Sequence, residues 1–241
     1  MAGFDASAAA RWIAEAVETG NALSALPAEI APPDITAAAE VAAAVLDALE
    51  IPPCGLRLLH RTGAATLAGP MIEGRLIPSG AEVALRSLRH PVVTGALVGV
   101  LAEALDPAST TPPVLARLHP ALDISATRFG DPPEDARLLT ADLARLGLVI
   151  VGRGKAVPAG TLRAALAPKG TRRRGQEIDL ASAFLEAATA ARAWGGLPAG
   201  ALLVVAGLTA PEAPTEPGTG TPTVTLRASF GVLGAAEVRF S

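Results

Sequence analysis

The sequence predicts an α+β fold in which a helical amino-terminal lobe precedes a mixed β domain. Two observations lead to this prediction. Residues 1–50 show helical periodicity, and after Cys54 the chain changes to short apolar runs interrupted by glycine and proline. A chain of 241 residues can bury a sizeable core as one domain with a helical extension. We therefore expect a lobe over 1–50 and a β domain over 51–241.

Two amphipathic helices are expected in the lobe. The first covers about 6–18, ends at Gly20 and places four apolar side chains on one face, namely Trp12, Ile13, Ala16 and Val17. The second begins after Asp34, whose carboxylate can cap it, and stops before Pro52 because proline has no amide hydrogen to donate. We expect Trp12 and Val45 to be mostly buried.

Short apolar runs predict the strands of the β domain. In chain order they are LRLL, RLIP, EVAL, VVTGALVGVL, ALDIS, GLVIV, ALLVVAGL (201–208), TVTLRASF (223–230) and the closing GAAEVRFS. Residues 209–222 are rich in proline, threonine and glycine and predict an irregular loop. One further helix is expected over 180–194, after Asp179 and before two glycines, with Leu185 and Trp194 mostly buried.

Composition argues against several classes of function. The formal net charge is −3, only 3% of residues are aromatic and tyrosine is absent, so side chains that attract or stack on nucleic acid are poorly supplied. The basic run at 172–174 predicts a solvated loop. The single cysteine, Cys54, excludes an intrachain disulfide and a cysteine-based zinc cage, and we expect it to be a bystander thiol in a reducing compartment.

Targeting and membrane signals are not evident in the sequence. The amino terminus places Asp5 before any basic residue and has no continuous apolar stretch of the kind found in secretory signals. The longest weakly polar run, 92–105, contains Glu103 and is shorter than the roughly 20 residues that a membrane-spanning helix needs. We expect a cytoplasmic protein without membrane or nucleic-acid partners.

Ordered segments over nearly the whole chain resemble one enzyme family. The segment AGPMIEGRLIPSGAEVALRSLRHP is similar to the family's stretch of a short strand followed by G-x-x-V-P-L, and HPALDISATRFGD is similar to its P-A-L-E-I-x-x-S-R strand. LLTADLARLGLVIVG retains the Ala-Asp pair and two glycines of a third motif, and FGVLGAAEVRFS resembles the family's terminal G-L-G-x-V-x-x-x-F. By these motifs the chain resembles the 2-keto-4-pentenoate hydratase and 4-oxalocrotonate decarboxylase branch of the fumarylacetoacetate hydrolase superfamily. The resemblance implies a helical amino-terminal lobe plus a mixed β-sandwich roll.

The resemblance also implies a metal-assisted reaction on a 2-keto acid. In this family a Glu-x-Glu pair and a third carboxylate hold Mg²⁺ or Mn²⁺, a Lewis acid that polarises the keto group. The Glu-x-Glu positions fall on Thr94 and Ala96, so only the third position keeps a carboxylate, as Asp123. One carboxylate cannot hold Mg²⁺ against its hydration shell, so we expect no cofactor unless other residues rebuild the site.

Other family positions are altered as well. Arg57 stands where the family has lysine, and it cannot donate a proton near neutral pH. The family's amino-terminal Tyr and Gln are replaced by Glu40 and Ala43, whereas Asp142 is retained. Arg57, Asp123 and Asp142 are the candidate catalytic residues that remain, and Asp123 could instead form a structural ion pair with Arg57.

Other residues could take over the role of the lost carboxylates in two ways. His90 and His119 with Asp123 could form a transition-metal site, and the third histidine, His60, could contact a ligand. A structural role for each histidine is the alternative that we favour, since no two of them share a ligand motif. The second way is to bind an anion without a metal, through the arginines at positions 57, 61, 128 and 145: Arg57, Arg61, Arg128 and Arg145. The simpler interpretation is that each of these arginines is a solvated surface residue.

Two functional hypotheses follow. The chain is either a hydratase-like protein that has become catalytically altered or silent and binds a ligand or partner subunit, or an active lyase on a small 2-keto acid with a rearranged site. Candidate ligands are small 2-keto or dicarboxylic acids. The alanine-rich composition and the family's habit of forming oligomers also predict self-association or pairing with another subunit.

Overall fold

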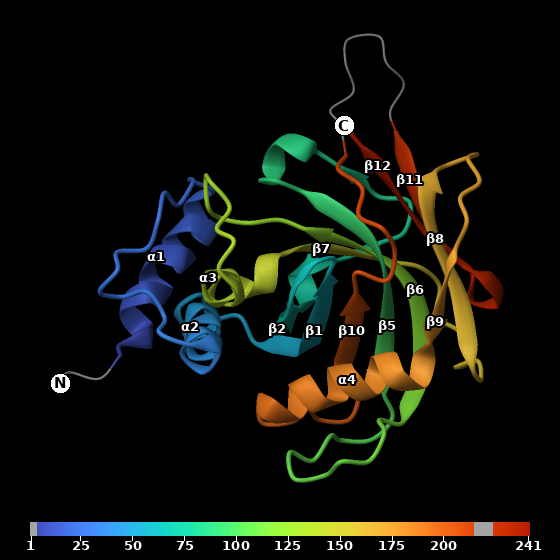
Figure 1. Ribbon diagram of the computed structural model, residues 1–241, viewed down its shortest axis with the longest axis horizontal. Helices are drawn as coiled ribbons and strands as arrows, with labels where there is room; N and C mark the ends of the chain where they lie inside the picture. Colours follow the sequence, from blue (N-terminus) through green and yellow to red (C-terminus); the bar gives the residue numbers. More distant parts are fainter. Residues whose placement is uncertain (1–3, 215–223) are drawn as a thin grey trace.

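The computed structural model describes residues 4–214 and 224–241 and shows three layers (Figure 1). The helices are α1 (Ala6–Thr19), α2 (Ile35–Ala48), α3 (Ala136–Ala141) and α4 (Leu180–Ala193). Short 3₁₀ turns are η1 (Glu73–Arg75), η2 (Leu85–Ser87), η3 (Leu143–Arg145) and η4 (Gly231–Leu233). Within the described residues, no helix is long and apolar enough to cross a membrane.

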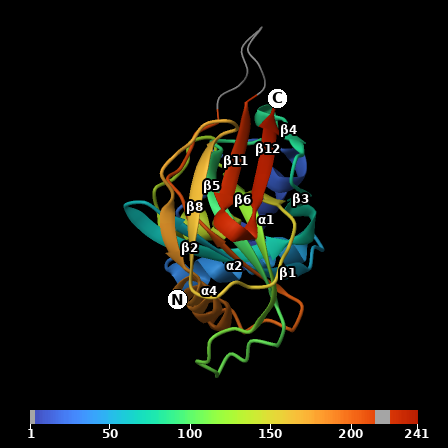
Figure 2. The same ribbon diagram turned by 90° about the vertical axis from the view of Figure 1, so that its right-hand side faces the viewer.

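Within the described residues, twelve strands form two mixed sheets. The five-stranded sheet faces the viewer in Figure 2. The seven-stranded sheet has the order β2-β1-β10-β5-β6-β7-β3, and the five-stranded sheet has the order β4-β12-β11-β8-β9. The strands are β1 (Pro53–Arg61), β2 (Ala64–Ile72), β3 (Leu76–Pro78), β4 (Glu82–Val83), β5 (Val92–Leu101), β6 (Leu115–Ser125), β7 (Leu146–Val151), β8 (Thr161–Pro168), β9 (Gln176–Asp179), β10 (Leu202–Ala206), β11 (Thr225–Phe230) and β12 (Ala235–Phe240). The β1–β10, β3–β7 and β4–β12 pairs are parallel and the other pairs are antiparallel.

Two apolar cores hold the layers together. One lies between the two sheets and includes α4, with Phe184, Phe230 and Phe240 as its large side chains. The other lies between the seven-stranded sheet and the helical lobe, and its helix side consists mainly of alanine. Because successive strand residues face opposite sides, each central strand contributes to both cores, and the seven-stranded sheet is covered on both faces.

The α+β architecture expected from the sequence is confirmed. Asp34 and Asp179 cap α2 and α4 as expected, and Gly20 ends α1 in the left-handed conformation. The lobe is not made by residues 1–50 alone, because α3 packs against α2 (Figure 1). Of the loop expected over 209–222, residues 215–222 lie outside the described residues, as does residue 223 at the start of the expected strand 223–230.

The burial prediction is wrong for two residues. Trp12 is 47% exposed and Leu185 is 39% exposed, whereas Val45 is fully buried and Trp194 is half-buried. Trp12 directly precedes Ile13 and Leu185 directly follows Phe184, and both neighbours are buried. Adjacent helix positions differ by about 100° around the axis, so each side chain lies at the edge of the face that packs.

Candidate functional site

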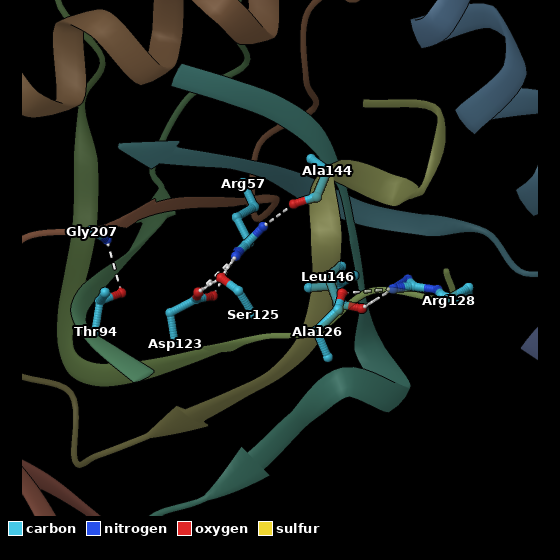
Figure 3. Close-up of polar contacts among 9 residues, drawn as sticks. All are labelled: Arg57, Thr94, Asp123, Ser125, Ala126, Arg128, Ala144, Leu146 and Gly207. Carbon is cyan, nitrogen blue, oxygen red and sulfur yellow. Dashed lines mark hydrogen bonds and ion pairs between the residues drawn. The ribbon is translucent and has the colours of Figure 1, made fainter. Parts of the chain in front are cut away.

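The lobe-facing side of the seven-stranded sheet brings polar side chains from three strands together: β1, β5 and β6. Thr94 of β5 lies opposite Asp123 of β6, and Ser125 lies two residues further on the same face. β1 and β6 are separated by two strands in the sheet order, but the sheet curls and Arg57 of β1 reaches Asp123 (Figure 3).

Arg57 and Asp123 form a buried two-pronged ion pair. Nε and Nη2 of Arg57 donate to Oδ1 and Oδ2 of Asp123 over 2.6 Å each, and the two side chains are 1% and 0% exposed. Nη2 also donates to Ser125 Oγ over 2.8 Å, Nη1 donates to the Ala144 carbonyl over 2.8 Å, and Ser125 Oγ donates to Asp123 Oδ2 over 2.7 Å. The ion pair considered from the sequence is therefore present, with both carboxylate oxygens and three guanidinium nitrogens occupied.

A second buried pair lies beside the first. Asp142 accepts from Thr127 Oγ1 over 2.6 Å and from the Arg128 amide over 3.2 Å, and Arg128 Nε lies 3.2 Å from Asp142 Oδ1. Burial raises the pKa of Asp142, while the charge of Arg128 and these hydrogen bonds oppose that rise. The remaining Arg128 nitrogens donate to the carbonyls of Ala126 and Leu146 (Figure 3). Asp142 therefore joins β6 to the segment before β7.

The segment between the two pairs has a strained backbone. Leu143, Ala144 and Arg145 have φ values of 51°, 51° and 59°, the left-handed region that side chains disfavour by about 1–2 kcal/mol per residue. The Arg145 amide donates to the Asp142 carbonyl within the turn. Three further hydrogen bonds tie the turn to other segments: Arg57 to the Ala144 carbonyl, the Ala126 amide to the Arg145 carbonyl, and Arg145 Nη2 to the His90 carbonyl. Such strain persists only where neighbouring contacts impose it, and it is common at functional sites.

A cavity of about 150 Å³ opens above this network. No Asp or Glu is among its described lining residues, and the polar ones are His60, Arg61, Thr62, Thr94, Ser125, Arg145 and Thr209. Burial, and then the neighbouring charge of Arg61, lower the pKa of Arg145, while Asp142 opposes this effect. The Nε of Arg145 is buried without a hydrogen-bond partner among the described residues. Arg61 and Arg145 therefore give the cavity a cationic lining.

The three histidines are not brought together. His90 Nε2 hydrogen-bonds the Gly130 carbonyl and His119 Nδ1 hydrogen-bonds the Gly152 carbonyl, whereas His60 lines the cavity with Nε2 3.8 Å from Glu186. His119 and Asp123 share a strand face, but four residues along a strand span about 13 Å, too far for one metal ion. The structure therefore does not bring His90, His119 and Asp123 together at one metal position.

The residues at the three implied ligand positions do not fit a magnesium ion. Thr94 is neutral and its Oγ1 accepts a hydrogen bond from the Gly207 amide over 3.1 Å (Figure 3), Ala96 has no ligand atom, and Asp123 is occupied by Arg57. Across residues 4–214 and 224–241, no three His, Cys, Asp or Glu side chains are grouped as metal ligands would be. The guanidinium of Arg57 is the cation that Asp123 binds.

Comparison with known proteins identifies the fold. No family model matches the sequence, and no curated protein matches it. Among solved structures, 4-oxalocrotonate decarboxylase from Pseudomonas putida G7, complexed with magnesium and adipate, matches with a TM-score of 0.75 and 17% identity over 98% of this chain and 97% of that one. The chain has the fold of the fumarylacetoacetate hydrolase superfamily.

Two more distant enzymes share this fold. Fumarylpyruvate hydrolase from Pseudomonas aeruginosa, in complex with Mn²⁺ and pyruvate, matches with a TM-score of 0.54 and 12% identity over 77% of this chain and 88% of that one. The 2-hydroxyhepta-2,4-diene-1,7-dioate isomerase from Mycobacterium marinum matches with a TM-score of 0.53 and 11% identity over 79% of this chain and 76% of that one. The superfamily fold expected from the sequence motifs is thereby confirmed.

Two parts of the site were missed by sequence reasoning. Ser125 supports the buried pair, and its position two residues after Asp123 on a strand was a usable signal, because alternate strand residues share a face. Thr209 lines the cavity from a segment whose composition indicated only a loop. Nothing in the sequence pattern marked the left-handed turn, since it contains no glycine or asparagine.

Proposed function

We propose that this protein binds a small 2-keto or dicarboxylic acid in the 150 Å³ cavity through arginine side chains, without a divalent metal and without the metal-dependent reaction of its fold relatives. The observation that carries the proposal is Arg145. Arg145 is half-buried and lines a cavity that has no acidic residue in its described lining, and its buried Nε has no hydrogen-bond partner among the described residues.

The charge distribution supports an anionic ligand. The Arg57 charge is neutralised by Asp123, so the cations left at the cavity are Arg61 and Arg145. The nearby His60 has its Nε2 3.8 Å from Glu186. Arginine binds carboxylates in a planar, two-pronged geometry, which suits the acid groups of keto and dicarboxylic acids. Thr94 also lines the cavity, and its hydroxyl accepts from the Gly207 amide, so its own proton can be donated to a ligand oxygen.

The size of the cavity restricts the ligand. Drug-sized ligands occupy pockets of about 300–1,000 Å³, so a cavity of 150 Å³ suits an acid that is smaller than a drug-sized ligand. Adipate is the ligand bound by the decarboxylase relative and is therefore a suitable probe, and pyruvate is the smaller probe.

Calorimetry with adipate and pyruvate, each with EDTA and with Mg²⁺, tests this function. We expect binding that EDTA does not weaken and that Arg145→Gln weakens at least about tenfold, as expected for a lost charge-assisted hydrogen bond. Arg174→Gln, in the exposed loop at 172–174, is the matched control and should bind like the wild type. Binding that requires Mg²⁺, or that survives Arg145→Gln unchanged, would contradict the proposal.

A second experiment concerns the metal directly. Mg²⁺ should not bind tightly to the wild type, whereas a variant carrying Thr94→Glu and Ala96→Glu should gain affinity because two carboxylates return beside Asp123. Tight Mg²⁺ binding by the wild type, or magnesium-dependent hydration of 2-hydroxypenta-2,4-dienoate that Asp123→Ala abolishes, would favour the alternative of an active lyase with a rearranged site.

A further inference from the structure

A larger cavity, of about 380 Å³, lies on the other side of the β6–β7 connection. It opens between the end of α1, the turn η1, the segment from Arg86 to Arg89, and the residues that follow β6 and begin β7. It shares no lining residue with the 150 Å³ cavity. A ligand here would therefore occupy a separate site.

The lining contains four arginines and, among the described residues, no Asp or Glu: Arg75, Arg86, Arg89 and Arg128. Arg128 is 8% exposed and is neutralised by Asp142. No carboxylate of the described residues lies within ion-pair distance of the other three. Three guanidinium charges at this cavity therefore lack a counter-ion in the described part of the protein.

Arg75 is the most informative of the four. It is half-buried and makes no hydrogen bond within the described residues, although a guanidinium has five donors to satisfy. Burial, and then the charge of Arg128, lower its pKa. Arg89, by contrast, is anchored by a bond from Nη2 to the Gly20 carbonyl at the end of α1.

We propose that this cavity binds a phosphate dianion, either free or as the monoester of a small molecule. The arginines come from three separate segments, η1, the segment at η2 and the residues after β6, so their donors approach the cavity from different directions. A tetrahedral phosphate offers acceptors in all of these directions, whereas a carboxylate offers them in a single plane.

The rest of the lining fits the same ligand. Ser87 and Thr127 add hydroxyls, and Val17, Leu88 and Leu146 add an apolar wall against which the carbon part of a monoester can pack. The cavity volume exceeds that of one phosphate group and leaves room for such a part. Arg86 is exposed and can change its rotamer to close on the ligand without disturbing the core.

The test uses calorimetry on the full chain with inorganic phosphate, methyl phosphate and succinate, all at one ionic strength and at a pH at which phosphate is a dianion. We expect both phosphates to bind more tightly than succinate, and Arg75→Gln and Arg86→Gln each to weaken them at least about tenfold. Tighter binding of methyl phosphate would identify a monoester as the ligand, and tighter binding of inorganic phosphate would identify the free ion. Arg174→Gln is again the matched control.

Failure of this proposal is distinguishable from failure of the proposed function. Arg145→Gln should leave phosphate binding unchanged, and Arg75→Gln should leave adipate binding unchanged, because the two cavities share no lining residue. Arg86 is exposed, so its variant separates ligand loss from misfolding, which melting curves in phosphate-free buffer also monitor. Equal phosphate binding by wild type and both variants, stronger binding of succinate, or no phosphate binding by the wild type would overturn the proposal.

Discussion

Disruption of the Arg57–Asp123 pair should destabilise the protein strongly, and Arg57→Met should be the worst single change. This substitution leaves the Asp123 charge, 0% exposed, without its cation, which costs about 3–5 kcal/mol for a buried pair. It also removes the donor to the Ala144 carbonyl, a buried group whose loss of a partner costs about 1–3 kcal/mol more. Domains have a free energy of unfolding of only about 5–15 kcal/mol, so little stability would remain.

Three further variants show which interaction accounts for the lost free energy of unfolding. Asp123→Asn keeps the shape and an acceptor for Arg57 but removes the negative charge, so we expect a smaller loss than in Arg57→Met. The double variant Arg57→Met with Asp123→Leu replaces both charges by apolar groups, and its loss should be well below the sum of the two single losses. Lys169→Met breaks a pair in which Lys169 is 61% exposed and should cost less than about 1 kcal/mol.

Urea unfolding followed by far-ultraviolet circular dichroism measures the free energy of unfolding of these four variants and of Asp123→Leu. The cycle of Arg57→Met, Asp123→Leu and their double variant gives the coupling between Arg57 and Asp123. Additive losses in the cycle, or an Arg57→Met variant no less stable than Lys169→Met, would refute the argument that a desolvated charge pair holds the sheet and the left-handed turn together.

Three other outcomes are expected. Burial raises the pKa of Asp142 above its ordinary value of 3.8. The stability of the wild type relative to Asp142→Asn should therefore be greatest below pH 3.8 and should fall as the pH rises through the folded-state pKa. Urea titrations in which this relative stability rises with pH would contradict the prediction. Burial raises the pKa of Cys54, so its alkylation by iodoacetamide near neutral pH should be slower than that of glutathione. Light scattering should give a mass above that of a monomer, since Val114, Val157 and Leu185 are exposed; a monomer mass at micromolar concentration would contradict self-association.

The elements with strong local signals were predictable. The helices have aspartate caps, and β5 is a continuous apolar run, VVTGALVGVL, which is typical of a strand buried on both faces. β2 and β8 were missed because their sequences, AATLAGPMI and TLRAALAP, are rich in alanine and contain proline, so pairing with neighbouring strands decides their conformation. The short α3 has a cap at Asp135 but only six residues, too few for a recognisable period.

The sequence predicted the individual residues of the candidate site but not how their side chains pair. Motif resemblance singled out Arg57, Asp123 and Asp142, and strand alternation gives the face on which each side chain lies. Which arginine neutralises which carboxylate depends on the curl of the sheet, which brings β1 and β6 together across two strands. The curl is a property of the whole sheet, so the sequence alone could not predict that Arg57 pairs with Asp123 and Arg128 with Asp142.

The site pairs Asp123 with a cation, as a metal centre would, while its chemistry differs. The Arg57 guanidinium supplies a positive charge to Asp123, but its donors are bound to Asp123, Ser125 and Ala144, so it has no open coordination position to offer a substrate. On the proposed function, the charge that meets the ligand comes instead from Arg145. Substitution of Asp123 should therefore change the stability of the fold, whereas substitution of Arg145 should change the affinity for an acid, and this separation distinguishes a binding site from a metal-dependent active site.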